Sequence, residues 1–316
     1  MTESEYLLEV KNLCQEFTSG SGDKKISVKA VDNVSFGVRP AETFGLVGES
    51  GCGKTTTGRS IIRLYNPTSG EMYFDGQKIS GKMNNQLRKY LAENIAMIFQ
   101  DPIESLNPKM TIQEIIGEGL KIRGMKDREE IHRRVVEILT KVGLTEEHAT
   151  RYPHEFSGGQ RQRIGIARAM VIKPKMIIAD EPVSALDVSI QAQVINLLND
   201  LKKEMGLTIL FIAHNLSVVK YFSDRIGVMY YGRLMEVAKG ADLYAKPLHP
   251  YTRALLSAIP EPNPITERTR QRFDYDPARD HDYSKEKPSM VEIEPDHFVF
   301  CSPSELEKYR KEIGIL

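Results

Sequence analysis

Short apolar runs alternate along the chain with segments whose apolar residues recur at helical spacing. The runs 43–47, 176–179 and 207–213 have the length and composition of buried strands. Residues 54–65 after the first run predict a helix that stops before Asn66 and Pro67. A second helix follows the run 176–179, with its apolar face formed by Ile190, Val194, Leu197, Leu198 and Leu201. Strands that alternate with helices form right-handed βαβ units, so the pattern predicts an α/β fold with a parallel sheet.

The first part of the chain has a different pattern, typical of antiparallel strands. Residues 7–13 and 28–38 are β-type runs separated by a loop rich in glycine and serine. Asp75 and Gly76 separate two further short β-type runs, and this dipeptide tolerates the positive φ of a type I′ turn. We therefore expect an antiparallel β subdomain beside the parallel core.

Residues from about 101 to 172 are predominantly helical in pattern. The pattern predicts a helix that ends near Gly143, with Asp127 as its N-cap and Glu130 as its capping-box residue. Its apolar residues lie on one face, which we expect to be buried: Ile131, Val135, Ile138, Leu139 and Val142. Beyond about residue 260 the chain becomes rich in proline and charge, and 262–289 is interpreted as a linker or extended tail. Residues 290–300 form either a short docking strand or a merely structural tail.

Composition and charge exclude several classes of protein. The 316 residues, 41% hydrophobic and 27% charged, suit a globular chain of about two domains. Lys plus Arg and Asp plus Glu number 43 each, so no net positive field favours nucleic acid, although a local basic patch stays open. The longest apolar runs have five residues, far below the ~20 that span a bilayer, and the acidic N-terminus predicts no secretory signal. Three dispersed cysteines suit the reducing cytoplasm.

A glycine-rich loop follows the first buried strand and precedes the predicted helix at 54. It matches the phosphate-loop pattern G-x-x-x-x-G-K-[ST], whose backbone N–H groups surround phosphate oxygens. Lys54 would reach the β and γ phosphates, and Thr55 would offer its hydroxyl to Mg²⁺. The nucleotide-binding residues predicted here are Gly48, Ser50, Gly51, Gly53, Lys54, Thr55 and Thr56. Cys52 is either a small filler or a thiol whose oxidation would block the loop.

Two acidic residues end the apolar run 176–179. Asp180 at the strand end can hold Mg²⁺ through its water shell, while Glu181 can polarise an attacking water. The pair therefore supplies a metal ligand and a catalytic base to a nucleotide hydrolase.

A second anion-binding helix start lies 20 residues before Asp180. Ser157, Gly158, Gly159 and Gln160 place a hydroxyl and glycine N–H groups at the start of a helix. This sequence resembles the signature of ATP-binding cassette (ABC) proteins, in which the signature of one subunit faces the phosphate loop of a second. The resemblance implies ATP as the nucleotide and that these four residues contact ATP held by the partner subunit.

The remaining positions of the ABC pattern are also filled. The resemblance assigns Gln100 to the Q-loop, as a catalytic residue and Mg²⁺ ligand, and Asp187 to the D-loop beside the nucleotide. His214, after the strand 207–213, corresponds to the switch histidine that contacts the γ-phosphate. Phe17 is where the family stacks a ring on adenine, although a core position is the alternative. The implied fold is an ABC-type P-loop ATPase with a RecA-like parallel-sheet core, an antiparallel β subdomain and a helical signature subdomain at about 101–172.

Three further blocks resemble one branch of that family, the oligopeptide and dipeptide importers. These blocks are 97–108, 151–155 and 248–260. The resemblance implies residues 1–260 as the ABC domain and 261–316 as a C-terminal extension of the importer type. Cys301 stands alone in this extension, so we expect no iron–sulfur cluster. Nickel and oligosaccharide transporters of the same branch remain alternatives for the cargo.

The resemblance also implies partners and a location. We expect a second ABC ATPase subunit, in a homodimer or a heterodimer, with two transmembrane permease subunits and an extracytoplasmic substrate-binding protein. Nucleic acid is not an expected partner. The chain would lie peripherally on the cytoplasmic face of the cell membrane. A soluble ABC protein acting on ribosomes or DNA is the alternative from another class, but one phosphate loop and no long heptads disfavour it. An exporter ATPase would lack the three importer blocks.

Overall fold

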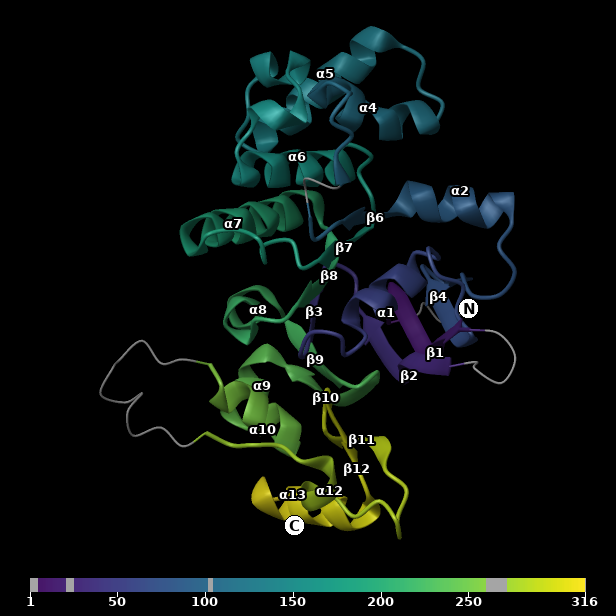
Figure 1. Ribbon diagram of the computed structural model, residues 1–316, viewed down its shortest axis with the longest axis vertical. Coiled ribbons are helices and arrows are strands. Elements are labelled where there is room, and N and C mark those ends of the chain that lie inside the picture. The colour runs from purple at the N-terminus through teal and green to yellow at the C-terminus, as the bar shows by residue number, and fades with distance from the viewer. Residues whose placement is uncertain (1–4, 21–25, 102–104, 260–271, 316) are drawn as a thin grey trace. The chain divides into compact units, whose positions relative to one another are not determined.

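The computed structural model describes residues 5–20, 26–101, 105–259 and 272–315, which form two compact units (Figure 1). The first unit comprises Met1–Leu8, Val38–Glu42 and Phe74–Ile212. The second comprises Glu9–Gly37, Thr43–Tyr73 and Ala213–Leu316. Each unit thus combines segments that are distant in the sequence. The predicted boundary at 260/261 and part of two importer blocks, residues 102–104 and 260, lie outside the described residues.

The first unit contains a parallel sheet of β6 (Ile95–Ile98), β7 (Met176–Asp180) and β8 (Thr208–Ala213), with β7 between the other two. Every residue of these strands is buried, which explains why the runs are continuously apolar instead of alternating. Ile98 pairs with Ala179, and Asp180 pairs with Ile212. The carboxyl ends of β6 and β7 therefore lie side by side, and the residues that follow them can meet.

In its described residues, the helical range predicted at about 101–172 contains helices α4, α5 and α6. Helices α4 and α5 pack on each other and on α6. The other helices of this unit are α2 and α7, and two 3₁₀ turns precede α6. The elements of the unit outside the sheet are β5 (Gln77–Lys78), α2 (Asn85–Asn94), α4 (Ile112–Ile122), α5 (Arg128–Lys141), η2 (Glu146–Thr150), η3 (Pro153–Glu155), α6 (Gly158–Met170) and α7 (Val188–Met205).

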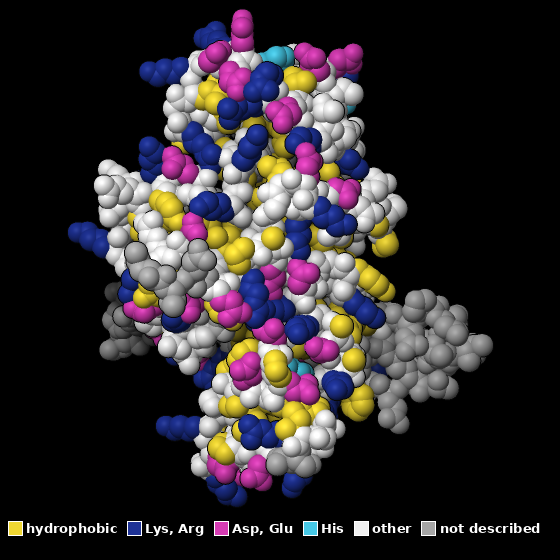
Figure 2. Space-filling view, turned by 180° about the vertical axis from the view of Figure 1, so that it is seen from behind, with side chains coloured by type: hydrophobic (Ala, Val, Ile, Leu, Met, Phe, Trp, Pro, Cys, Tyr) yellow, Lys and Arg dark blue, Asp and Glu magenta, His cyan; other side chains and the backbone are white. Residues whose placement is uncertain are grey.

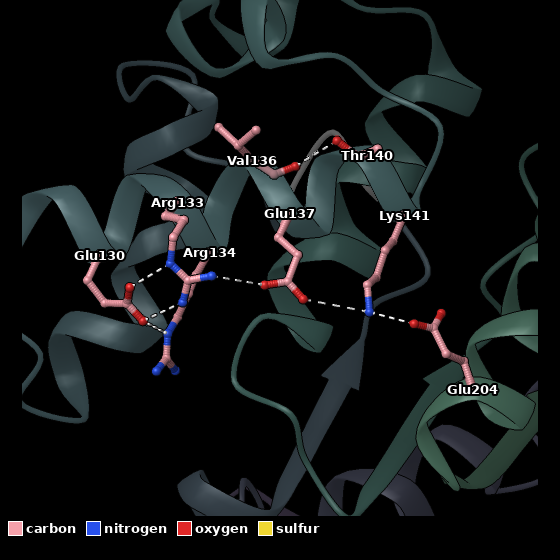
Figure 3. Close-up of polar contacts among 8 residues, drawn as sticks. All are labelled: Glu130, Arg133, Arg134, Val136, Glu137, Thr140, Lys141 and Glu204. Carbon is pink, nitrogen blue, oxygen red and sulfur yellow. Dashed lines mark hydrogen bonds and ion pairs between the residues drawn. The ribbon is translucent and has the colours of Figure 1, made fainter.

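Helix α5 confirms the predicted buried stripe and N-cap but not the predicted capping box. The carboxylate of Asp127 accepts the N–H groups of residues 129 and 130. Glu130 instead accepts hydrogen bonds from Arg133 and Arg134, and these guanidinium groups lower its pKa to about 2 (Figure 3). Two adjacent cations thus outcompete one backbone N–H for this carboxylate. Lys141 extends the charged face to Glu204 of α7, at 2.6 Å (Figure 3).

In the second unit, five strands lie side by side in the order β11-β12-β10-β9-β3, where β3 and β9 are parallel and the other pairs antiparallel. Strands β2, β1 and β4 form a second sheet in that order. The predicted turn is present, since Asp75 and Gly76 after β4 have φ of 50° and 73°. The strands are β1 (Leu8–Ser19), β2 (Ile26–Val38), β3 (Thr43–Val47), β4 (Ser69–Phe74), β9 (Arg225–Tyr230), β10 (Arg233–Lys239), β11 (Ser289–Glu294) and β12 (His297–Cys301).

The helix after the phosphate loop is shorter than predicted. It ends at Ile61 because the chain turns at Arg63, whose φ is 63°, and the N–H groups of residues 64 and 65 both bond to the oxygen of Arg59. The helices of this unit are α1 (Lys54–Ile61), α8 (Leu216–Phe222), α9 (Gly240–Ala245), α10 (Pro250–Ser257), α12 (Pro277–Asp280) and α13 (Pro303–Glu312).

The C-terminal segment, described here over residues 272–315, has more regular structure than an extended tail. The linker interpretation of 262–289 is wrong for its described part, residues 272–289, because α12 forms there and Tyr275 and His281 contact His249. The strand expected at 290–300 is a hairpin, β11 and β12, whose second strand pairs with β10. A buried contact of 2.8 Å between His297 Nε2 and Glu236 Oε1 joins β12 to β10. The docking alternative is therefore correct for this segment.

The surface is mixed in charge. On the face shown in Figure 2, Lys and Arg side chains are interspersed with Asp and Glu side chains. Across residues 5–20, 26–101, 105–259 and 272–315, no helix is both long enough and apolar enough to span a bilayer.

Candidate functional site

The phosphate loop lies between β3 and α1, and its glycines are required by its shape. Gly48, Gly51 and Gly53 have φ of 151°, 80° and 105°, in the region that favours glycine. A Cβ atom on Gly48 would lie 2.2 Å from the backbone oxygen of Met229, and one on Gly53 would lie 2.3 Å from that of Ala30. No other residue fits either position without displacing backbone.

The side chain of Lys54 is held inside this loop. Its Nζ atom donates hydrogen bonds of 2.8 Å to the backbone oxygens of Gly48 and Glu49, and only 4% of the residue is exposed. Thr55 and Thr56 follow in the first turn of α1, where both are half-buried. The loop thus combines a cation with the N–H groups of a helix start, and two hydroxyls follow in the first turn, an arrangement suited to phosphate.

Cys52 is a buried residue of the loop. It is 5% exposed, and burial raises the pKa of its thiol. Since the thiolate is the form that oxidants attack, the structure favours the filler interpretation over a redox role.

Phe17 and His214 also belong to the second unit. Phe17 projects from β1, is 39% exposed, and meets Tyr65 edge-on at 5.1 Å between ring centroids. It is therefore not a core residue, and its stacking on adenine stays a prediction. His214 is exposed, directly after β8 and before Asn215, which caps α8. Its contact with a γ-phosphate likewise stays a prediction.

The two acidic residues at the end of β7 have opposite environments. Asp180 is completely buried, whereas Glu181 is partly exposed. Glu181 also has a φ of 45°, which is costly for a residue with a side chain and is typical of functional sites. Its N–H donates to the oxygen of Ile212 in β8 at 2.9 Å, and its own oxygen accepts the N–H and hydroxyl of Ser184. These contacts hold the strained backbone in place.

Gln100 lies beside Glu181. The Nε2 atom of Gln100 is 3.4 Å from Oε2 of Glu181, a contact made possible because β6 and β7 are adjacent and parallel. The amide oxygen of Gln100 takes no part in this contact, and its role as a Mg²⁺ ligand stays a prediction.

The signature residues cap helix α6. Ser157 is the N-cap, its Oγ accepts the N–H of Gln160, and Oε1 of Gln160 accepts the N–H of Ser157. Pairing of these two side chains with the backbone is a capping box, a role that adds to the expected one in phosphate binding. Ser157 and Gly158 are exposed, so the helix start is accessible from solvent.

Gly159 permits close packing of α6 on α7. A Cβ atom there would lie 2.8 Å from Cγ2 of Ile190, whereas one on Gly158 would lie 3.9 Å from Leu186. Asp187 is the exposed N-cap residue of α7, and no hydrogen bond from its side chain caps the helix. Its place beside the nucleotide stays a prediction.

The predicted site residues fall into two groups. The phosphate loop, Phe17 and His214 belong to the second unit, while Gln100, Asp180, Glu181, Asp187 and residues 157–160 belong to the first. Within the first unit the structure brings Gln100 and Glu181 into contact, as the motifs imply. Two features were not predicted: the left-handed backbone of Glu181 and a contact of Tyr251 with the phosphate loop. No pattern in the sequence signals either.

The residues predicted to bind Mg²⁺ have suitable chemistry. Thr55 offers a hydroxyl, Gln100 an amide oxygen and Asp180 a buried carboxylate, all oxygen donors of the type Mg²⁺ prefers. Within the described residues, no group of three or more His, Cys, Asp or Glu side chains could form a metal site by itself. The three oxygen donors of Thr55, Gln100 and Asp180 therefore suit a Mg²⁺ ion that also binds nucleotide phosphates.

Family models match two parts of the chain. Residues 31–184 match the ABC transporter model, and residues 235–284 match the C-terminal region of oligopeptide/dipeptide transporters. The first match contains the phosphate loop, the signature and the two acidic residues after β7.

Curated relatives resemble the chain over nearly its full length. The oligopeptide transport ATP-binding protein OppF of Bacillus subtilis is 56% identical over 97% of this chain and 99% of its own length. The oligopeptide transport ATP-binding protein AmiF of Streptococcus pneumoniae is 55% identical over 98% of this chain and 100% of its own length. The dipeptide transport ATP-binding protein DppF of Lactococcus lactis is 52% identical over 98% of this chain and 99% of its own length.

Solved structures of ATP-binding cassettes share the fold. The cassette MJ0796, dimeric in a post-hydrolysis state with ADP and phosphate, has a TM-score of 0.66 at 32% identity, covering 73% of this chain and 98% of that one. CbiO1 of Clostridium perfringens, part of an ABC transporter complex, has a TM-score of 0.67 at 27% identity, covering 77% and 92%. The fold is thus the α/β P-loop cassette that the motifs predict. The chain therefore belongs to the ABC transporter family, in its oligopeptide and dipeptide transport branch, and is one of the ATPases of that family.

Proposed function

We propose that this chain binds ATP with Mg²⁺ and uses hydrolysis to drive the uptake of oligopeptides or dipeptides through separate membrane permeases. One observation carries the proposal: a complete set of ATPase residues stands in the same chain as a C-terminal region of the oligopeptide/dipeptide type. The names of the relatives, which are oligopeptide and dipeptide transport proteins, support the cargo.

The nucleotide is held mainly by the second unit. Lys54 binds the β and γ phosphates, the N-terminus of α1 adds positive potential, and Phe17 stacks on adenine. Thr55, Gln100 and Asp180 would hold Mg²⁺, which neutralises charge on the phosphate oxygens. The proposal for Gln100 is supported by its amide nitrogen facing Glu181, which directs its oxygen to another partner.

Hydrolysis depends on Glu181 and His214. Glu181 orients the attacking water and accepts its proton, and the hydrogen bond from Gln100 holds the carboxylate in one direction. His214 contacts the γ-phosphate and stabilises the charge that develops there. The strained backbone of Glu181 supports this role, because strain of this kind persists where function requires one orientation.

The signature completes the site of a second subunit. Ser157, Gly158, Gly159 and Gln160 contact the γ-phosphate bound to the partner, and Asp187 lies beside the same interface. The exposure of the α6 start and the dimeric state of the cassette MJ0796 support this arrangement. The second subunit is either another copy of this chain or a different ABC ATPase.

The transporter supplies the membrane components. Residues 1–260 serve as the ABC domain and 261–316 as its C-terminal extension, and the helices within about 101–172 contact two permease subunits on the cytoplasmic face. An extracytoplasmic binding protein delivers the substrate. Gln100, which leads into the helical range, links the γ-phosphate to the permease contact.

Co-purification tests the proposal. Glu181→Gln protein, tagged and isolated with ATP from its own cells in mild detergent, should retain its partners, since ATP is bound but not hydrolysed. Mass spectrometry should then identify two permeases and a substrate-binding protein, whose ligand reports the cargo. Lys54→Ala protein is the matched control with the same tag. A binding protein specific for nickel or oligosaccharide would contradict the peptide cargo, and ribosomal or DNA-repair proteins without permeases would contradict transport.

A further inference from the structure

The phosphate loop makes a contact with a residue 202 positions further along the chain. Tyr251 is the second residue of α10 and is 3% exposed, and its hydroxyl oxygen accepts the N–H of Glu49 at 3.3 Å. Tyr251 is not among the residues assigned above to nucleotide or metal binding.

Tyr251 and Lys54 hold the same peptide unit. The peptide between Gly48 and Glu49 presents its C=O to Nζ of Lys54 at 2.8 Å and its N–H to the hydroxyl of Tyr251. Because a trans peptide is planar, fixing the direction of its N–H also fixes the opposite direction of its C=O. The tyrosine hydroxyl thus sets the orientation of the carbonyl against which the lysine ammonium rests.

The C-terminal segment helps to hold the ring of Tyr251. The ring centroid lies 4.5 Å from that of Tyr230 in β9 and 5.4 Å from that of Tyr275, which directly precedes the α12 cap. Tyr275 also contacts Tyr230 at 5.1 Å, so the three rings pack mutually. The backbone N–H of Tyr251 is fixed by Nδ1 of His249 at 3.1 Å. Packed aromatic rings of this kind restrict each other's rotation.

We propose that Tyr251 is a positioning residue for ATP binding and that the C-terminal segment, through Tyr275, keeps its hydroxyl on the phosphate loop. Without the hydroxyl, the peptide between Gly48 and Glu49 is held only through its C=O by Lys54, so the orientation of the peptide and of the lysine ammonium is less restricted. The loop then has to be ordered when ATP binds, which weakens affinity without altering Glu181. The inference concerns the ATPase itself and does not depend on the cargo.

The variant Tyr251→Phe tests the proposal directly, because it keeps the ring and removes only the hydrogen-bond acceptor. We expect the dissociation constant and the KM for ATP to rise roughly three- to tenfold, with kcat changed less than about twofold. Tyr90→Phe is the matched control, since the Tyr90 hydroxyl also hydrogen-bonds to the backbone, here by donating to the oxygen of Phe74, but in the other unit. An unchanged KM, or a fall in kcat alone, would overturn the proposal.

A double-mutant cycle tests the role of Tyr275. Tyr275→Leu removes the packing ring and should raise the KM for ATP, whereas Tyr275→Phe, which keeps the ring, should not. In the Tyr251→Phe background, Tyr275→Leu should add less than about twofold, because the hydroxyl on which it acts is already absent. Full multiplication of the two effects would refute action through Tyr251. Thermal unfolding of each full-length variant separates these shifts from a general loss of stability.

Discussion

The amide nitrogen of Gln100 donates a hydrogen bond to Oε2 of Glu181 across 3.4 Å. The contact joins the residue two positions past β6 to the residue directly past β7. It places the proposed sensor of the γ-phosphate in direct contact with the proposed base, so a change at one side chain is felt at the other.

Lys54→Ala and Glu181→Gln should have different effects on ATP. Loss of the ammonium removes charge-assisted hydrogen bonds to phosphate, so ATP affinity should fall roughly 10- to 100-fold. Glu181→Gln keeps the shape of the side chain but removes the base, so kcat should fall about 10²- to 10⁴-fold while ATP still binds. Equilibrium binding and steady-state hydrolysis check both. Equal loss of ATP binding in the two variants would contradict the assignment.

Ser157→Arg should leave ATP binding to the isolated chain unchanged and stop ATP-dependent dimerisation. A long cationic side chain at the α6 start would occupy the space of the partner's phosphates. Light scattering in the Glu181→Gln background measures dimerisation. Thr111→Arg removes an equivalent cap from α4, which also has a capping box, and should leave dimerisation intact. Normal dimerisation and turnover by Ser157→Arg protein would refute the split site.

Gly159→Ala should destabilise the protein more than Gly158→Ala. The new Cβ on residue 159 meets Ile190 at 2.8 Å, so α6 and α7 must separate, whereas residue 158 has space. Overpacking of this kind should lower the free energy of unfolding by about 1–3 kcal/mol, and alanine at 158 should change it by less than about 1 kcal/mol. Urea denaturation of both variants provides the measurement, and equal stabilities would show that the helices adjust freely.

Acid should destabilise the protein partly through His249. Burial, with a smaller effect of His281, lowers the pKa of His249 from 6.5 to about 3. The imidazole is thus neutral in the folded state while the unfolded chain binds a proton below pH 6.5, so stability falls as pH drops from about 6.5 towards 3. Relative to His249→Asn, which can still cap α10, the natural chain should lose about 2 kcal/mol between pH 7 and pH 5.

Denaturation at the two pH values tests this difference, because other titrating groups contribute equally to both proteins. A constant difference between the natural chain and His249→Asn would mean that His249 takes up a proton in the folded state as readily as in the unfolded state.

Local signals in the sequence predicted most of the elements that form the site. The continuous apolar run at β7 reports burial on both faces, and the glycines at 48, 51 and 53 report a backbone that only glycine adopts. Both signals can be recognised within a few residues of the sequence. Helix α1 shows where prediction from local pattern fails, because the left-handed turn at Arg63 ends the helix before the apolar pattern ends.

Short-range motifs were sufficient to predict the P-loop cassette, the branch of the family and the candidate ATPase residues. The three-dimensional packing was needed to establish which distant groups meet: Gln100 with Glu181, and Tyr251 with the phosphate loop. It also decided that the described part of the C-terminal segment packs against β10 and α10. Such contacts depend on strand register and the packing of whole elements, and no local spacing encodes them.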